Sequence, residues 1–223
     1  MSRKYAILMD GGFVTKVLEK RLKHFPNVAD VETECNRIKA HDALKGYDLL
    51  RIYFYNAPPA SKTLKNPVDG SIVKLGQTQV HVHHSSLFDA LELRPDFALR
   101  MGETMVHGWK LGSKALENMS ANPRQPTAKD FVPNIEQKGV DLRIGLDIAR
   151  LALRELVDAI VVVTGDSDFV PAFKFARREG IRVYLDHMGH GVRRELKVHA
   201  DLVLPPPPRA KARENNPPEK SPK

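Results

Sequence analysis

The sequence contains a single cysteine, Cys35, among its 223 residues. One cysteine cannot form a disulfide within the chain, which excludes a small secreted scaffold held together by disulfides. No apolar run approaches the roughly 20 residues that a helix needs to span a bilayer. Residues 1–10 carry no small-residue cleavage site of the kind that follows a secretory signal. We therefore expect a cytoplasmic protein that does not associate with membranes.

The sequence has fewer acidic than basic residues: 27 Asp and Glu against 35 Lys and Arg, which gives a formal net charge of +8. Part of this excess belongs to residues 205–223, a proline-rich segment with five basic and two acidic residues and almost no apolar ones. That composition predicts a disordered tail. A modest positive charge remains on residues 1–204, and it favours polyanionic partners without specifying which one.

Apolar runs typical of buried strands alternate with stretches of helical periodicity. Such alternation predicts an α/β domain in which helices cover both faces of a central, mainly parallel sheet. We assign one domain to residues 1–204. The strands are expected at residues 4–10, 49–56, 159–163, 182–185 and 202–204, and the helices at 13–24, 30–45, 139–156, 169–178 and 192–199.

Residues 60–135 form an insertion that the pattern describes poorly. We expect a loop over 60–71, a helix over 85–93, and a hairpin over 97–111 that packs on the main sheet. Three prolines within residues 118–134 predict a mobile loop there. His81, His83 and His84 have a spacing that would suit a metal if they lay on a strand, but without a nearby carboxylate we interpret them as surface strand residues.

Aspartates follow two of the predicted strands. Asp10 ends the first, and Asp166 and Asp168 come directly after the strand over residues 159–163. The carboxyl ends of parallel strands meet at one edge of a sheet, so we expect these side chains to lie together. Asp168 taken alone has an alternative role as a helix N-cap, but a cap would not account for Asp10.

Asp141 and Asp147 add two acids on the preceding helical segment. They lie six positions apart, about 120° around a regular helix, so both face one site only if the helix begins between them, as Gly145 would allow. Either acid has a solvated or capping alternative. Converging carboxylates repel one another unless a cation neutralises them, and such oxygen ligands suit Mg²⁺ or Mn²⁺. An ion held there would activate a water against a phosphate.

Three blocks of the sequence resemble the NYN domain, and in particular its LabA-like branch, within the PIN-like nuclease superfamily. They are MDGGF (9–13), KGVDLRIGLD (138–147) and VVVTGDSDFVPAFKFARREGIRVYL (161–185). The resemblance runs from about residue 5 to residue 204. It implies a PIN-like Rossmannoid three-layer sandwich and a metal-dependent ribonuclease activity on RNA, expected to be single-stranded. Relatives often carry an asparagine near position 13, where this chain has none.

Carried over by position, the resemblance makes Asp10 the acid after the first strand and Asp166 and Asp168 the late pair. Asp147 matches the acid that opens the penultimate helix of PIN domains, and Asp141 belongs to the KGVD block. We predict Asp10, Asp147 and Asp166 as the inner metal ligands, with Asp141 and Asp168 as further ligands or supporting acids. The predicted catalytic residues are Asp10, Asp147, Asp166 and Asp168.

Seven residues near these acids are predicted to bind substrate. The hydroxyls of Thr164 and Ser167 would orient water or the phosphate. Lys138 would meet a phosphate, or else be solvated. A basic rim for an RNA backbone, or else a solvated charged face, would be formed by Arg177, Arg178, Arg182, Arg193, Arg194 and Lys197. The full set is Gly11, Lys138, Thr164, Gly165, Ser167, Arg193 and Arg194.

Two other functions remain open from the sequence. The first is a catalytically silent domain that binds RNA or a protein partner. The second is a phosphatase of small metabolites, although Gly12 and Phe13 stand where that chemistry usually has a second aspartate. Gly11 and Gly12 do not extend to a GxGxxG motif, which disfavours dinucleotide binding. The sequence leaves homo-oligomer formation undecided.

Overall fold

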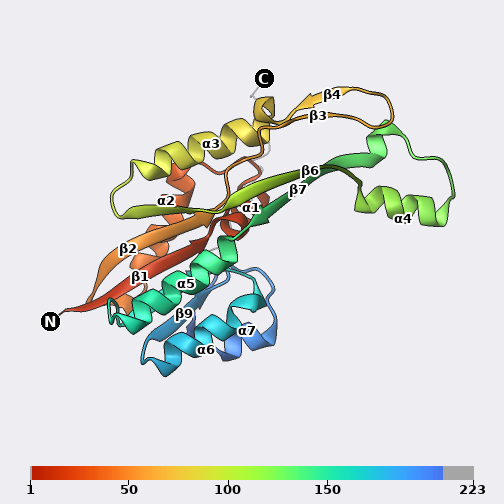
Figure 1. Ribbon diagram of the computed structural model, residues 1–223. Coiled ribbons are helices and arrows are strands. Elements are labelled where there is room, and N and C mark those ends of the chain that lie inside the picture. Colours follow the sequence, from red (N-terminus) through yellow and green to blue (C-terminus); the bar gives the residue numbers. More distant parts are fainter. Residues whose placement is uncertain (1, 208–223) are drawn as a thin grey trace, which may run out of the picture.

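A computed structural model describes residues 2–207 of the protein, and its centre is a sheet of six parallel strands (Figure 1). The order across the sheet is β10-β9-β8-β1-β2-β5. Its strands are β1 (Arg3–Asp10), β2 (Tyr47–Asn56), β5 (Phe97–Met101), β8 (Ala159–Val163), β9 (Arg182–Asp186) and β10 (Leu202–Val203). The tail that the sequence predicts lies, from residue 208 onward, outside the described residues.

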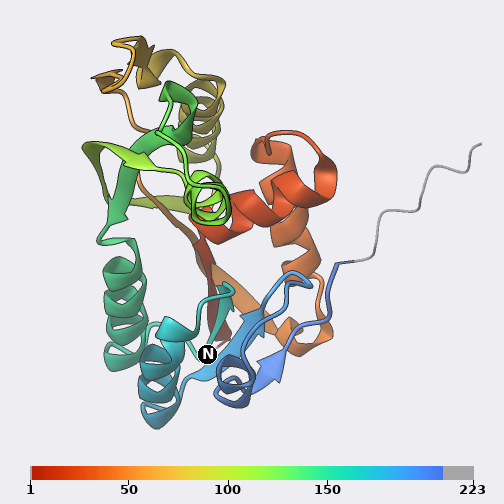
Figure 2. The same ribbon diagram turned by 90° about the vertical axis from the view of Figure 1, so that its right-hand side faces the viewer.

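Helices cover both faces of this sheet (Figure 2). Successive side chains of β1 alternate between the faces: Ile7 and Met9 pack toward one helical layer, Ala6 and Leu8 toward the other. The first layer is α1 (Gly11–Leu22), α2 (Val28–Lys39) and α3 (Gln79–Glu92), and the second is α5 (Val140–Leu153), α6 (Val170–Arg178) and α7 (Arg194–Val198). The predicted three-layer α/β sandwich, consistent with a PIN-like Rossmannoid fold, is confirmed.

The order of the strands reverses between β1 and β8. From β1 the chain moves outward through β2 to β5, and it then returns to the other side of β1 to form β8, β9 and β10. In parallel sheets, the crevice beyond the carboxyl ends of the strands at such a reversal is the usual ligand site. Asp10 ends β1 at this position, and Thr164 follows β8.

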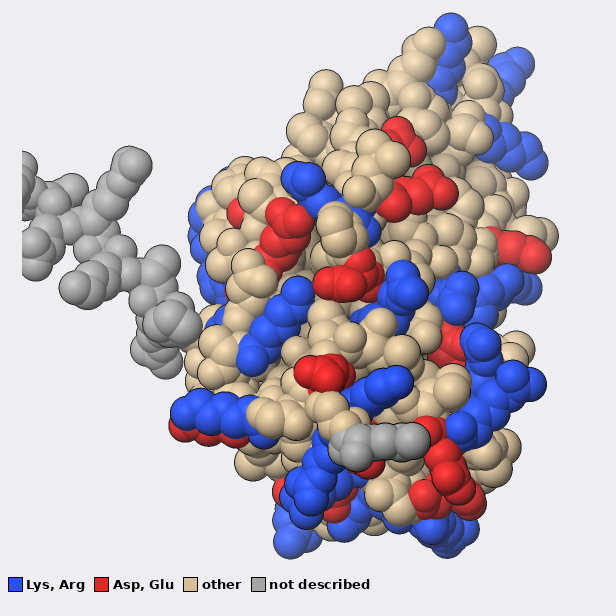
Figure 3. Space-filling view, turned by 90° about the vertical axis from the view of Figure 1, so that its left-hand side faces the viewer, with Lys and Arg blue, Asp and Glu red and all other residues tan. Residues whose placement is uncertain are grey.

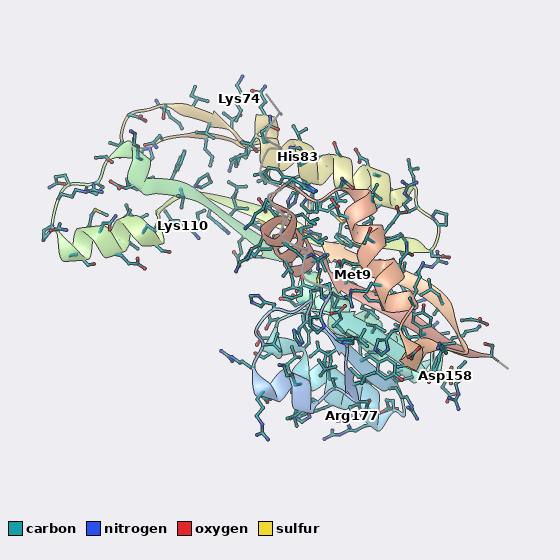
Figure 4. All side chains as sticks on the ribbon, turned by 180° about the vertical axis from the view of Figure 1, so that it is seen from behind. Met9, Lys74, His83, Lys110, Asp158 and Arg177 are labelled. Carbon is teal, nitrogen blue, oxygen red and sulfur yellow. The ribbon has the colours of Figure 1, made fainter. Side chains whose placement is uncertain are left out.

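An arm projects from the carboxyl edge of the sheet (Figure 1). We define the arm as residues 63–74 and 103–138. A hydrogen bond of 2.8 Å from Trp109 Nε1 to the Lys65 carbonyl joins its two parts. Figure 4 shows Lys110 on the arm, well away from Arg177 on the body. The arm contains the hairpin β3 (Thr63–Lys65) and β4 (Ile72–Lys74), the antiparallel pair β6 (Glu103–Leu111) and β7 (Phe131–Lys138), and α4 (Ser113–Ala121).

Several predictions for residues 60–135 are wrong. Residues 97–101 form the edge strand β5 of the main sheet, whereas 103–111 pair with 131–138 in the arm. The expected loop over 118–134 holds the end of α4 and the start of β7, because the strand partner that orders it lies about 25 residues earlier in the chain. The three histidines lie on α3, not on a strand, since the Thr78 side chain caps a helix that begins at Gln79 (Figure 4 shows His83).

Four short 3-10 turns complete the described elements, and one of them, η4, borders the site. Asp30, expected to begin a helix, is instead the third residue of a capping box whose N-cap is Asn27. Within residues 2–207, no helix combines the length and the apolar character needed to cross a membrane. The turns are η1 (Asp42–Leu44), η2 (Leu75–Gln77), η3 (Ala128–Asp130) and η4 (Ser167–Phe169).

Candidate functional site

Asp10 is held at the point where the strand order reverses. Its Oδ1 accepts a hydrogen bond of 3.1 Å from the backbone N–H of Phe13 and so caps α1. Its Oδ2 accepts from the Thr164 hydroxyl at 3.2 Å. The Thr164 oxygen in turn accepts from the backbone N–H of Asp166 at 3.1 Å. These bonds link the ends of β1 and β8 and leave the Asp10 carboxylate little freedom to rotate.

Four carboxylates act on one another at this edge. Burial raises the pKa of Asp10 against the hydrogen bonds from Phe13 and Thr164, and the charges of Asp141 and Asp166 raise it further. The pKa of Asp141 is raised by burial and then by the charges of Asp166 and Asp168. We call Asp10, Asp141, Asp166 and Asp168 the acid cluster. Within residues 2–207, no lysine or arginine forms a salt bridge with any of the four.

Asp147 does not lie with the acid cluster. Helix α5 begins at Val140, before both Asp141 and Asp147, because Gly139 adopts a left-handed conformation with φ of 72° that ends β7 and turns the chain into the helix. The two acids therefore point about 120° apart. Asp147 accepts a hydrogen bond of 3.0 Å from the Tyr55 hydroxyl and pairs with Arg100 at 3.2 Å. Asp141 thus lies with Asp10, Asp166 and Asp168, whereas Asp147 lies with Tyr55 and Arg100.

Asp166 and Asp168 are both exposed in the short turn η4 after β8. Asp166 is the residue that caps this turn, because its Oδ1 accepts from the backbone N–H of Asp168 at 2.9 Å. The capping role considered for Asp168 therefore belongs to Asp166.

A pocket of about 550 Å³ opens beside the acid cluster. Three of the predicted substrate residues, Gly165, Ser167 and Arg193, line it. Lys16 also lines it and was missed, although its helical spacing of four from Gly12 was a usable signal. His190, which packs edge-on against Phe13 with 5.8 Å between ring centres, forms another part of the wall. The lining residues are Asp10, Gly12, Phe13, Lys16, Gly165, Asp166, Ser167, His190, Gly191, Val192 and Arg193.

The other four predicted substrate residues lie differently. Thr164 is buried and holds Asp10, as described above. Lys138 is exposed with its Nζ 3.6 Å from Glu136, on the opposite face of β7 from Gln137. Arg194 is exposed at the start of α7 and does not line the pocket. Gly11 is the first residue of α1 and is buried.

The position of Gly11 demands a residue without a side chain. A Cβ there would lie 2.5 Å from the Phe54 ring and 2.6 Å from the Tyr55 carbonyl oxygen. We expect Gly11→Ala to lower the free energy of unfolding by about 1–3 kcal/mol, the usual cost of overpacking, measured by urea denaturation. Gly145→Ala, where a Cβ meets nothing within 4 Å, is the control. Equal stability of the two variants would contradict the close approach.

Two polar residues near the cluster were missed. Asn56 ends β2 as Asp10 ends β1, so the same reasoning from strand ends would have found it. It is buried, and its Oδ1 accepts from Gln137 Nε2 at 3.2 Å. A Cβ on Gly12 would lie 3.5 Å from Asp10 Oδ1 and 3.8 Å from Gln137 Oε1, which places Gln137 next to the cluster. No sequence signal pointed to Gln137, because residues 118–134 were expected to be a loop and no strand was expected over residues 135–138.

The basic rim expected from the sequence is divided between two edges of the sheet. Arg193 lies at the acid cluster, but Arg177, Arg178 and Arg182 line a separate pocket of about 530 Å³ at the amino end of β9. There Arg177 pairs with Asp201 at 2.9 Å. The face at the amino ends of the strands mixes basic and acidic side chains (Figure 3). These arginines therefore do not border the candidate site.

The donors of the acid cluster fit a hard divalent cation. They are carboxylates whose charges and burial raise the pKa of Asp10 and Asp141, and within residues 2–207 none of them forms a salt bridge with a lysine or arginine. In that same part of the chain, no three His, Cys, Asp or Glu side chains are grouped tightly enough to coordinate one ion as they stand. Mg²⁺ usually keeps several waters and needs only one or two protein carboxylates together with substrate phosphate. The residues present thus suit a hydrated Mg²⁺ or Mn²⁺.

Comparison with known proteins gives three findings. The chain is 32% identical over 74 residues to an uncharacterised protein of Methanocaldococcus jannaschii, an alignment that covers 33% of this chain and 31% of that one. A solved structure of a protein of unknown function from Vibrio parahaemolyticus superposes with a TM-score of 0.49 and 16% identity, covering 91% of this chain and 92% of the other. Residues 101–203, which include Asp141, Asp166 and Asp168, match the family model of the NYN domain, a member of the PIN-like nuclease superfamily.

Proposed function

We propose that this chain is a metal-dependent ribonuclease of the LabA-like NYN branch that cleaves single-stranded RNA in the cytoplasm. The observation that carries the proposal is the acid cluster itself: four carboxylates gathered at the reversal of strand order, none of which forms a salt bridge with a lysine or arginine in residues 2–207. Repulsion between such carboxylates raises the free energy of the folded state unless a cation binds there and neutralises their charge. The KGVD block that typifies the LabA-like branch supplies one of its members, Asp141.

The residues of the site divide between holding the ion and holding RNA. Asp10, Asp141 and Asp166 would hold Mg²⁺ or Mn²⁺, with Asp168 adjoining them. When bound, the ion supplies Lewis-acid stabilisation of the charge that develops on the phosphoryl group. Lys16 and Arg193 in the adjoining pocket bind backbone phosphates, and the Ser167 hydroxyl orients a phosphate oxygen. Affinity for RNA should accordingly fall with salt.

Asp166→Asn tests this function. Asparagine keeps the oxygen that caps η4 but removes the charge from the cluster. We expect the variant to fold normally and to lose metal-dependent cleavage by on the order of 10²–10³-fold, the scale seen when one group facing the reacting charge is removed. The measurement is cleavage of labelled single-stranded RNA with Mn²⁺ or with EDTA.

Asp48→Asn is the matched control, because Asp48 is exposed near the amino end of β2, at the opposite edge of the sheet from the site. Its cleavage rate should equal that of the unmodified protein. Unchanged cleavage by Asp166→Asn would remove the proposed site. RNA binding without cleavage under every metal tried would instead identify a catalytically silent RNA-binding domain.

A further inference from the structure

A second pocket, of about 290 Å³, lies where the arm joins the body. It sits beyond the carboxyl ends of β2 and β5, because Pro58 and Pro59 follow β2 and Thr104 belongs to the strand that follows β5. The acid cluster lies beyond β1 and β8, so the pocket is the next position along the same edge of the sheet.

Gln137 connects this pocket to the acid cluster. It lines the pocket, and its Oε1 and the Oδ1 of Asp10 both lie within 4 Å of the point where a Gly12 Cβ would be. The basic pocket with Lys16 and Arg193 borders the cluster as well. A strand whose phosphates lie in the basic pocket and at the cluster therefore continues directly toward the pocket at the arm.

The lining of this pocket suits an uncharged, flat group. None of its lining residues is Lys, Arg, Asp or Glu. Prolines and the side chains of Leu75, Val80 and Ile135 supply apolar walls, and two imidazole rings add flat surfaces. Burial lowers the pKa of one of these, His84, which keeps its ring neutral near pH 7. A phosphate or a carboxylate would find no cation here.

The polar groups of the pocket present mainly acceptors. His81 Nδ1 lies 3.0 Å from the Ala60 carbonyl, which can only accept, so Nδ1 is the donor and Nε2 is the nitrogen that can accept in the uncharged form of the ring. The Thr104 hydroxyl donates to the Pro58 carbonyl, which leaves its oxygen lone pairs as acceptors, and Gln137 Nε2 donates one of its two N–H groups to Asn56. The free acceptors on His81 and Thr104 call for N–H donors, and the second N–H of Gln137 adds one donor. A flat ring with N–H groups on its edge describes a nucleobase.

We propose that this pocket binds one base of the RNA strand and sets a sequence preference at one position beside the scissile phosphate. This proposal rests on the ribonuclease function proposed above, because a scissile phosphate exists only if the protein cleaves RNA. Base binding itself does not require cleavage, and it can be measured on the inactive protein.

Filling the pocket from two different elements tests the proposal. Ile135→Trp and Val80→Trp place an indole in the pocket from β7 and from α3. Val132→Trp and Val82→Trp are their controls, since these valines lie on the same elements, do not line the pocket, and have similar exposed fractions of 40% and 48%, against 40% for Ile135 and 52% for Val80. Two independent pairs ensure that one misfolded variant does not decide the result.

The probes are guanosine, adenosine, cytidine and uridine, with ribose 5-phosphate as the probe without a base, titrated by calorimetry into the Asp166→Asn protein. We expect at least one nucleoside to bind, ribose 5-phosphate not to bind, and affinity to fall at least 10-fold in the two pocket-filling variants alone. Failure of all four nucleosides to bind, or equal affinity in pocket and control variants, would overturn the proposal. Binding without any RNA cleavage would leave the base pocket standing and reject the ribonuclease.

With the active protein, one further measurement locates the base. A labelled oligonucleotide that contains a single abasic site is cleaved with the site moved through each position in turn. Cleavage should drop at least 10-fold when the abasic site occupies one position next to the cut, and Ile135→Trp should erase that difference. A flat profile from a protein that does cleave RNA would overturn the specificity role.

Discussion

Asp141→Asn should abolish metal-dependent cleavage of RNA, whereas Asp147→Asn should retain it to within about threefold. The reason is that the two acids point in different directions from one regular helix, α5. Asp141 lies in the first turn, where its charge raises the pKa of Asp10 and where the charges of Asp166 and Asp168 raise its own pKa. Loss of a ligand from the cluster is expected to reduce the rate by on the order of 10²–10³-fold. Initial rates with saturating Mn²⁺ provide the measurement.

In stability the order of the two variants should be reversed: Asp147→Asn should be less stable than Asp141→Asn. Asp141 is largely exposed, although its carboxylate is partly desolvated, and its charge is repelled by Asp166 and Asp168, so Asp141→Asn should not lower the free energy of unfolding. Asp147 pairs with Arg100 and accepts from Tyr55, so Asp147→Asn should lower the free energy of unfolding by about 1 kcal/mol, as expected for a pair that is partly exposed. Loss of activity in Asp147→Asn with full activity in Asp141→Asn would return the site to the arrangement expected from the family resemblance.

Arg37→Met should destabilise the protein by about 3–5 kcal/mol, the cost of leaving a buried charge without its partner. The Asp186 carboxylate is fully buried at the end of β9, where Arg37 of α2 binds it and the Met188 N–H donates to it at 2.8 Å. Arg37 also pairs with buried Glu34 at 3.1 Å. Burial lowers the pKa of Arg37, but Asp186 and Glu34 more than offset this. Urea denaturation gives the free energy of unfolding.

Arg94→Met serves as the control, because Arg94 also pairs with a glutamate of α2, Glu32, at 3.0 Å, but on the surface, where the two side chains are 44% and 35% exposed. That variant should lose no more than about 1 kcal/mol. Adding Asp186→Asn to Arg37→Met should restore part of the lost stability, because the buried negative charge is then removed. If Arg37→Met and Arg94→Met were equally stable, the buried pair would not hold α2 against β9.

Much of the sandwich could be predicted from the sequence. The strands that contain Ile7, Phe54 and Val161 have apolar residues at successive positions, so both of their faces are apolar. A strand needs this pattern only when helices cover the sheet on both sides. The arm could not be predicted in this way. Strand β7 has mostly exposed or half-buried side chains and a proline, so its own residues carry no strand signal, and it is ordered by pairing with β6. The pattern of residues within β7 does not reveal that β6 will pair with it.

The amino-acid sequence by itself determined the layered fold and the edge at which the acid cluster lies, because a parallel strand that is buried on both faces has apolar residues at successive positions. It also located Asp10 and Asp166, since an acid directly after such a strand has only that edge to occupy. Tertiary structure decided the remainder. The N-cap of α5 at Gly139 placed Asp141, rather than Asp147, in the acid cluster, and strand pairing in the arm brought Gln137 next to that cluster. Both outcomes depend on helix phase and on contacts between distant segments, which no local pattern of residues contains.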